Sequence, residues 1–157
     1  MAADRVERDV LIEAPIHVVW EVISEPEHIV RWFSDEAQLD LRPGGDGVLT
    51  WNQMANNQAA SYQLRFEAVE PPHRLTYRWV HSVDEDPRPG NSTLVEFTLS
   101  EEGTKTRLRV VETGIQLMSW PEAEKEEFAD SHGKGWARHL KRLGDYAPAA
   151  AAKRPVA

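Results

Sequence analysis

The chain is 157 residues long, and 18 Lys and Arg stand against 26 Asp and Glu, so the formal charge is -8 at pH 7. This acidic balance argues against binding to a nucleic-acid backbone, which requires clustered basic residues. Cysteine is missing, which excludes disulfides and zinc–thiolate sites, and neither a membrane span nor a signal peptide is recognisable, so we expect a cytoplasmic protein with no membrane partner.

The first elements change from strand to helix. Alternation of apolar and charged residues predicts a strand over 5–13, and apolar residues at helical spacing predict a helix over 16–23. A second short helix should follow, opened by a capping box of Ser24 and Glu27. Two helices between the first and second strands are therefore expected.

The middle of the chain is a series of strands. Glycine-rich and proline-rich turns separate the apolar alternations, and the glycines of GGDG at 44–47 lack the spacing of a dinucleotide-binding motif. The predicted strands cover 37–41, 48–53, 61–69, 74–81, 92–100 and 105–113. Short connections between successive strands predict an antiparallel meander.

A long C-terminal helix is predicted to begin at a capping box of Ser119 and Glu122. An apolar stripe at helical spacing runs along it: Phe128, His132, Trp136, Leu140 and Leu143. The Ala/Pro tail 147–157 is expected to be disordered.

These elements predict an α+β fold in which a seven-stranded antiparallel sheet is covered by the C-terminal helix, within one domain over 1–146. One amphipathic helix is narrow for so wide a sheet. The rest of the apolar surface is then either filled by the two short helices or left as a cavity.

Aromatic residues concentrate on the predicted inner faces, and the sequence leaves open whether they form an ordinary core or line a pocket. If there is a pocket, we expect these residues to bind the ligand: Trp32, Phe33, Trp51, Tyr62, Leu64, Tyr77, Trp79, His81, Phe97, Val110, His132, Trp136, His139 and Leu140. We also expect Gly135 to allow close approach of the helix to the sheet or to a ligand, because glycine inside a helix is otherwise unfavourable.

Three histidines could act as an acid or base beside such a cavity: His81, His132 and His139. The alternative is that they form hydrogen bonds at the rim of the sheet. His132 and His139 lie about 10 Å apart along the helix, which does not suit chelation, so no metal and no cofactor are expected. No catalytic residue is assigned from the sequence.

Several segments together resemble a known family: IEAPIHVVWEVISEPEHIVRWF, LRPGG, EPPHRLTYRW and GWARHLKRL. Over residues 5–146 the chain resembles the START-like (SRPBCC, helix-grip) superfamily, in the branch named after the activator of the heat-shock-protein-ninety ATPase. The resemblance implies a curved seven-stranded sheet gripping a C-terminal helix, with a deep, largely apolar cavity between them. Members of the superfamily bind lipids, sterols, hormones or polyketides, and some act as cyclases or dehydratases.

Three functions follow as hypotheses. The first is a protein that binds a small hydrophobic or aromatic ligand, and the second is a cyclase or hydrolase acting on a polyketide-like substrate. The third is a module that interacts with a chaperone; the eukaryotic co-chaperone has an additional N-terminal domain, so we expect no ATPase stimulation by this chain alone. A homodimer is compatible with all three.

Overall fold

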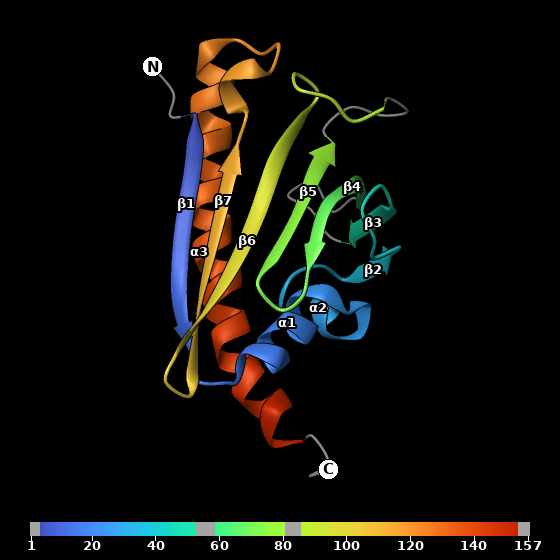
Figure 1. Ribbon diagram of the computed structural model, residues 1–157. Helices are drawn as coiled ribbons and strands as arrows, with labels where there is room; N and C mark the ends of the chain where they lie inside the picture. Colours follow the sequence, from blue (N-terminus) through green and yellow to red (C-terminus); the bar gives the residue numbers. More distant parts are fainter. Residues whose placement is uncertain (1–3, 53–58, 81–85, 154–157) are drawn as a thin grey trace.

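The computed structural model describes residues 4–52, 59–80 and 86–153, and Figure 1 shows a curved sheet with a long helix along one face. Within these residues, one sheet has seven antiparallel strands in the order β1-β7-β6-β5-β4-β3-β2. The strands are β1 Arg5–Ile12, β2 Glu36–Leu39, β3 Asp46–Trp51, β4 Ala60–Glu70, β5 Arg74–Val80, β6 Ser92–Glu102 and β7 Lys105–Thr113. The predicted α+β helix-grip fold is confirmed, including the meander.

The helices lie on the concave side of this sheet. α1 (Ile16–Ser24) and α2 (Pro26–Trp32) connect β1 to β2, and α3 (Glu122–Ala152) follows a short 3-10 turn, η1 (Ile115–Leu117). α3 runs beside β1, where Gly144 lies next to Val10, and its C-terminal half meets α1 and α2. α1 and α2 therefore cover part of the C-terminal half of α3.

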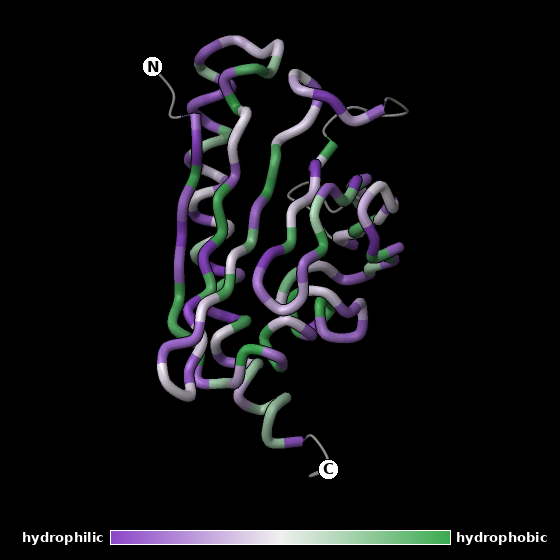
Figure 2. Tube along the Cα trace, viewed as in Figure 1, coloured by the Kyte–Doolittle hydropathy of each residue, from purple (hydrophilic) through white to green (hydrophobic). Residues whose placement is uncertain are grey.

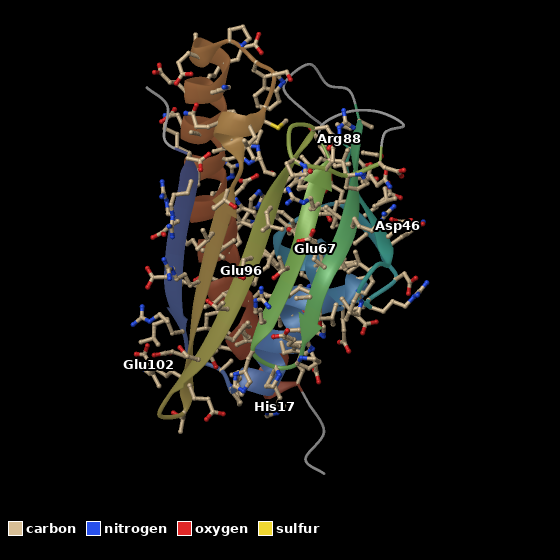
Figure 3. The ribbon with its side chains drawn as sticks, turned by 45° about the horizontal axis from the view of Figure 1, so that its top comes forward. His17, Asp46, Glu67, Arg88, Glu96 and Glu102 are labelled. Atoms are coloured by element: carbon tan, nitrogen blue, oxygen red, sulfur yellow. The ribbon has the colours of Figure 1, made fainter. Side chains whose placement is uncertain are left out.

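Residue alternation explains which side of each strand is buried. On β6 the residues Val95, Phe97 and Leu99 are buried, whereas Glu96 on the opposite side pairs with Arg74 at 2.9 Å. Figure 2 shows this alternation of hydrophobic and hydrophilic residues along the strands, and Figure 3 shows charged side chains such as Glu67 and Glu96 on the outer face. Period-two patterning thus places one face of the sheet against the helices and the other in water.

Both predicted capping boxes are wrong. α2 begins after Glu25 with Pro26 in its first turn, and the Ser24 hydroxyl instead donates to the Trp20 carbonyl of α1 at 2.6 Å. α3 begins after Pro121, and no side chain caps it. In both cases a proline at the start of the helix supplies the required backbone φ without a side-chain cap.

The predicted disordered tail is also wrong for 147–152, because α3 continues to Ala152 through Pro148. Ala147 is fully buried, and Ala150 and Ala151 pack against the core. Alanine also has the highest helix propensity. The propensity and the core contacts together explain why the helix continues past the proline. In the described part of the chain, no helix combines the length and apolar character needed to cross a bilayer.

Candidate functional site

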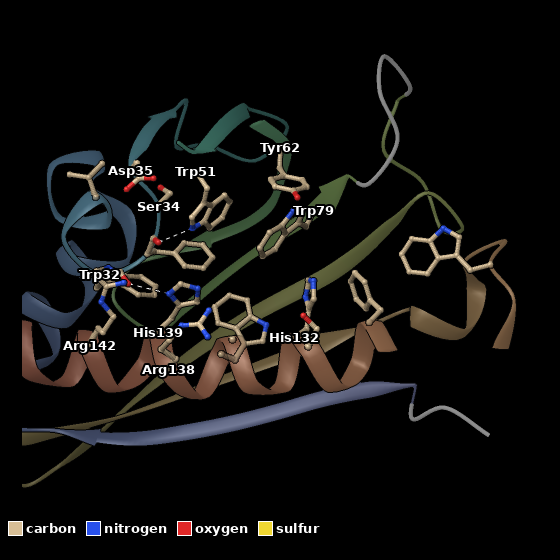
Figure 4. Close-up of a pocket in the computed structure, with 17 residues that line it drawn as sticks. Trp32, Ser34, Asp35, Trp51, Tyr62, Trp79, His132, Arg138, His139 and Arg142 are labelled. Carbon is tan, nitrogen blue, oxygen red and sulfur yellow. Dashed lines mark hydrogen bonds between the residues drawn. The ribbon is translucent and has the colours of Figure 1, made fainter. Parts of the chain in front are cut away.

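A pocket of about 720 Å³ lies between α3 and the strands β3–β5 (Figure 4). Eight of its seventeen lining residues are aromatic: Trp32, Phe33, Trp51, Tyr62, Trp79, Trp120, Phe128 and Trp136. Its polar lining comes from Ser34, Asp35, Ser131, His132, Arg138, His139 and Arg142, and Val30 and Gly135 complete it. The volume falls in the range of about 300–1,000 Å³ that is usual for small-molecule sites.

Phe33, the residue that ends α2, is the centre of the aromatic cluster. Its ring stacks on Trp136 of α3 at a centroid distance of 5.2 Å, and it stacks on Trp32 at 4.9 Å. Trp51 and His139 meet it edge-on at 5.2 and 4.9 Å. These contacts join α2, β3 and α3 around one ring, so the end of α2 fixes the geometry of the pocket.

The strands supply a second aromatic wall. Trp51 of β3 and Trp79 of β5 are parallel, with an interplanar angle of 2° and centroids 5.8 Å apart. Tyr62 of β4 lies edge-on to both at 5.7 Å. Inward-facing positions of three adjacent strands therefore build one continuous aromatic surface.

Three of the indoles direct their N–H groups to acceptors within the protein. Trp32 donates to the Val22 carbonyl at 2.9 Å, and Trp51 donates to the Phe33 carbonyl at 3.1 Å. Trp136 donates to Oε1 of Glu112 at 3.0 Å. These bonds hold the rings in place, so the ring faces rather than the N–H groups are presented to the pocket.

Glu112 of β7 is a fully buried carboxylate directly behind the pocket wall. It accepts hydrogen bonds from Thr93 Oγ1 at 2.6 Å, from His132 Nδ1 at 2.7 Å and from Trp136 Nε1 at 3.0 Å. Burial raises the pKa of Glu112, but the hydrogen bond and charge of His132, with the bonds from Thr93 and Trp136, outweigh it and lower the pKa below its usual value. The carboxylate is therefore ionised, and His132 is oriented by it at the edge of the pocket.

His139 behaves differently. Burial, together with the nearby charges of Arg138 and Arg142, lowers the pKa of His139 to about 4, although its hydrogen bond to the Trp32 carbonyl at 3.3 Å acts in the other direction. The imidazole is thus neutral at pH 7, with Nδ1 as the donor to that carbonyl.

Eight of the predicted ligand-binding residues line the pocket: Trp32, Phe33, Trp51, Tyr62, Trp79, His132, Trp136 and His139. Leu64, Tyr77 and Phe97 line a separate void of about 20 Å³, which is closed core. Val110 and Leu140 are buried and line neither space, and His81 lies outside the described residues. The resemblance implied a deep, largely apolar cavity, but the deep part is filled and the remaining pocket has polar and charged residues along one side.

Sequence reasoning missed the residues that give the pocket its polarity. Ser131, Arg138 and Arg142 lie together on one side of the apolar stripe of α3, a side that the stripe itself does not single out. Ser34 and Asp35 follow α2, and the sequence pattern did not indicate their position. The hydrogen bonds that His132 and Trp136 of α3 donate to Glu112 were not predicted.

The expectation that Gly135 permits close helix–sheet packing is wrong. A Cβ built at Gly135 meets no atom of the described residues within 4 Å, and the residue borders the pocket. The close approach is at Gly133, where a Cβ would lie 2.6 Å from Arg8 Nη2. The other part of the expectation, that Gly135 leaves room for a ligand, remains a prediction.

One group of possible metal ligands lies outside the pocket. In the described part of the chain, donor atoms of Glu21, Glu25 and His28 lie within 4.8 Å of one another. His28 Nδ1 is already hydrogen-bonded to the Tyr146 hydroxyl at 2.7 Å. None of these three residues lines the pocket, and the cluster was not expected from the sequence.

Comparison with known proteins agrees with the fold. DynU16, a protein in the dynemicin biosynthetic locus, is 23% identical with a TM-score of 0.74; the match covers 98% of this chain and 50% of DynU16, so this chain spans about half its length. CalU16 from Micromonospora echinospora is 29% identical with a TM-score of 0.66, and the match covers 91% of this chain and 75% of CalU16. The Aha1 dimer from Colwellia psychrerythraea is 15% identical with a TM-score of 0.68, over 90% and 93% of the two chains.

The chain matches no curated protein. A family model described as activator of Hsp90 ATPase homolog 1-like protein matches residues 13–147, which include every strand except β1 and every residue that lines the pocket. The chain therefore belongs to the family of activator of Hsp90 ATPase homolog 1-like proteins, within the START-like helix-grip fold.

Proposed function

We propose that this protein binds a small hydrophobic or aromatic molecule in the pocket between α3 and strands β3–β5. The observation that carries the proposal is the pocket itself, an unfilled space of about 720 Å³ with eight aromatic side chains in its wall. Aromatic walls with a few polar groups are typical of sites for small organic ligands. Two structural neighbours, one of them described as belonging to the dynemicin biosynthetic locus, are in keeping with a small organic ligand.

The fixed rings favour an apolar ligand over a polar one. Trp32, Trp51 and Trp136 already donate their N–H groups within the protein, so a ligand would meet mainly their ring faces. Because these rings are ordered before binding, little side-chain entropy is lost when a planar ligand enters.

The test is a calorimetric titration with 2-naphthalenemethanol, a planar neutral probe. Gly135→Leu should place an isobutyl group in the pocket, whereas Ala137→Leu gives the same final side chain at an exposed position of α3 outside the pocket. We expect saturable binding by the wild type and by Ala137→Leu, and at least tenfold weaker binding by Gly135→Leu. Thermal melts confirm that both variants are folded.

Absence of saturable binding to the wild type, or equal binding by Gly135→Leu, would reject the proposal. The melts make the second outcome interpretable, because a folded Gly135→Leu variant that still binds must bind elsewhere.

An enzyme is the second candidate, and the Glu112–His132 pair favours it. A buried carboxylate 2.7 Å from an imidazole at the pocket edge is the arrangement of a general base with its orienting group. Of the three histidines considered from the sequence, this one is supported best. Hydrolysis of 2-naphthyl acetate above background, lost in His132→Gln while 2-naphthalenemethanol still binds, would establish the enzyme; turnover independent of His132 would exclude this site.

The description of the family suggests a third candidate function, the stimulation of a chaperone ATPase. The large exposed hydrophobic residues of the described chain, Leu11, Val30, Val48 and Leu117, lie on four different elements, and Val30 borders the pocket, so they do not suggest a docking patch. We expect no stimulation of Hsp90 ATPase by this chain, and a saturable increase at micromolar concentration would promote the co-chaperone role.

We further propose a cytoplasmic location, and a homodimer by likeness to the Aha1 dimer. Light scattering during gel filtration measures the oligomeric state directly, and a monomeric mass would exclude the dimer.

A further inference from the structure

The pocket has a cationic side that the binding proposal does not use. Arg138 and Arg142 lie four residues apart on α3, and both line the pocket beside His139. Figure 4 shows them rising from the helix on the side of the aromatic wall, near the end of α2. Residues at this spacing are about 6 Å apart along the axis, close enough for two guanidinium groups to reach one ligand group.

Arg138 and Arg142 have no ion-pair partner in the described part of the chain. Among the residues that the structure describes, no carboxylate oxygen lies within 4 Å of the guanidinium nitrogens of Arg138 or Arg142. The lysines of the same helix differ, because Lys134 pairs with Asp130 at 3.0 Å and Lys141 pairs with Asp145 at 3.3 Å. Both arginines thus offer positive charge at the edge of the pocket, in a chain whose net charge is -8.

Their field reaches the interior of the pocket. The charges of Arg138 and Arg142 both contribute, after burial, to lowering the pKa of His139, whose ring packs edge-on against Phe33. Asp35 also borders the pocket, and its Oδ2 accepts the Asn52 backbone N–H at 2.7 Å; it keeps its negative charge, so the two arginines outnumber one carboxylate among the pocket-lining residues. Arg138 and Arg142 are themselves exposed, so water screens part of this field, whereas the aromatic wall of the pocket does not.

The opposite end of the site is acidic. A second hollow shares Trp120, Phe128, Ser131 and His132 with the pocket and continues to Glu124 and Glu127. From Glu127 to Arg138 the helix rises about 16 Å. A ligand with one anionic end would therefore be repelled at the start of α3 and attracted near α2.

We propose, on the basis of the binding function above, that the ligand is an aromatic carboxylate whose rings lie against the indole wall and whose carboxylate meets Arg138 and Arg142. Arginine suits this role because its planar guanidinium binds a carboxylate through two parallel hydrogen bonds. The cavity is large enough for a ligand of several fused rings.

The experiment compares 2-naphthoate with 2-naphthalenemethanol, which have the same ring system and differ in charge. Calorimetry should show at least tenfold tighter binding of 2-naphthoate by the wild type. The Arg138→Gln/Arg142→Gln double variant should lose at least tenfold in 2-naphthoate affinity while its affinity for 2-naphthalenemethanol changes less than twofold.

The matched control is Lys134→Gln/Lys141→Gln, which removes two positive charges from the same helix outside the pocket. It should bind 2-naphthoate within about twofold of the wild type. If it weakens binding as much as the arginine variant does, the effect is overall charge and the proposed contact is refuted.

The two proposals fail in different ways. Equal affinity for the two probes, with saturable binding of both, refutes the carboxylate proposal and leaves the aromatic pocket standing. No binding of either probe refutes both.

Discussion

Replacement of Glu112 by Gln tests the buried network that fixes one wall of the pocket. Its Oε1 accepts from His132 and Trp136 and its Oε2 from Thr93, so one side chain joins β6, β7 and α3. Gln has the same shape: its carbonyl can accept from His132 and Trp136, and its amide can donate to the Thr93 hydroxyl. The change therefore removes the charge while keeping the contacts.

The magnitude follows from the difference between charged and neutral hydrogen bonds. A bond to a charged group contributes about 1.5–3 kcal/mol and a neutral one about 0.5–1.5 kcal/mol, and three bonds are affected. Relief of the buried charge offsets part of this loss, so we expect Glu112→Gln to lower the free energy of unfolding by about 1–3 kcal/mol at pH 7. Glu112→Leu, which removes the acceptor of all three bonds, should cost about 3–5 kcal/mol.

The loss should also depend on pH. A carboxyl whose pKa is lowered in the fold contributes stability above its unfolded value of 4.5 and loses it as the pH falls through the folded value. The difference between wild type and Glu112→Gln should thus be full at pH 7 and shrink below pH 4.5. Groups that do not contact Glu112 titrate alike in the two proteins, so their contributions cancel in the difference.

Urea unfolding followed by far-UV circular dichroism measures these values. Glu96→Gln, which breaks a pair with Arg74 on the outer face, is the matched control and should cost less than about 1 kcal/mol. If Glu112→Gln is as stable as the wild type at pH 7, the cost of burying the charge equals the stabilisation from its hydrogen bonds. That result would contradict a net stabilising role of the Glu112 carboxylate.

Three further predictions concern α3. Gly135→Ala should raise the free energy of unfolding by about 0.5–1 kcal/mol, since its Cβ meets no described atom, and a lower melting temperature would contradict the open space found there. Because the pKa of His139 is lowered from 6.5 to about 4, its contribution to the free energy of unfolding is present above pH 6.5 and is lost as the pH falls. In urea unfolding, the free energy of unfolding of the wild type should therefore fall by about 2 kcal/mol more than that of His139→Gln between pH 7 and pH 5. An equal decrease in the two proteins would contradict this prediction. Truncation after Tyr146 should cost roughly 1–2 kcal/mol because it removes buried Ala147 and the alanines packed on the core, and an unchanged melt would show that this last stretch of helix contributes nothing.

Strand patterning predicts the sheet well because alternation is a local property. β7 was predicted at its observed bounds, and the inward rows that contain Trp51, Tyr62 and Trp79 follow from the same period. Alternation identifies a face of a strand but not the position along that face. Tyr77 and Phe97 therefore share the inward face with Trp79, yet they pack in the closed core.

The charged part of the site depends on tertiary contacts. Thr93, His132 and Trp136 lie 19, 20 and 24 residues from Glu112 in the sequence, and only the packing of α3 on the sheet brings them together. Arg138 and Arg142 read as ordinary polar positions of an amphipathic helix. Their position at the pocket depends on the tertiary structure, in which a space remains between that side of α3 and the strands β3–β5.

Binding of an aromatic molecule in the pocket can be observed directly in a nitrogen-15 NMR titration of the six tryptophan indoles with 2-naphthalenemethanol. Trp32, Trp51, Trp79, Trp120 and Trp136 line the pocket, whereas Trp20 of α1 does not and serves as an internal reference. If the probe binds in the pocket, we expect the indole signals of the pocket tryptophans to shift saturably with one dissociation constant, while the signal of Trp20 stays in place. Unchanged pocket signals, or a shift of Trp20 as large as theirs, would contradict it.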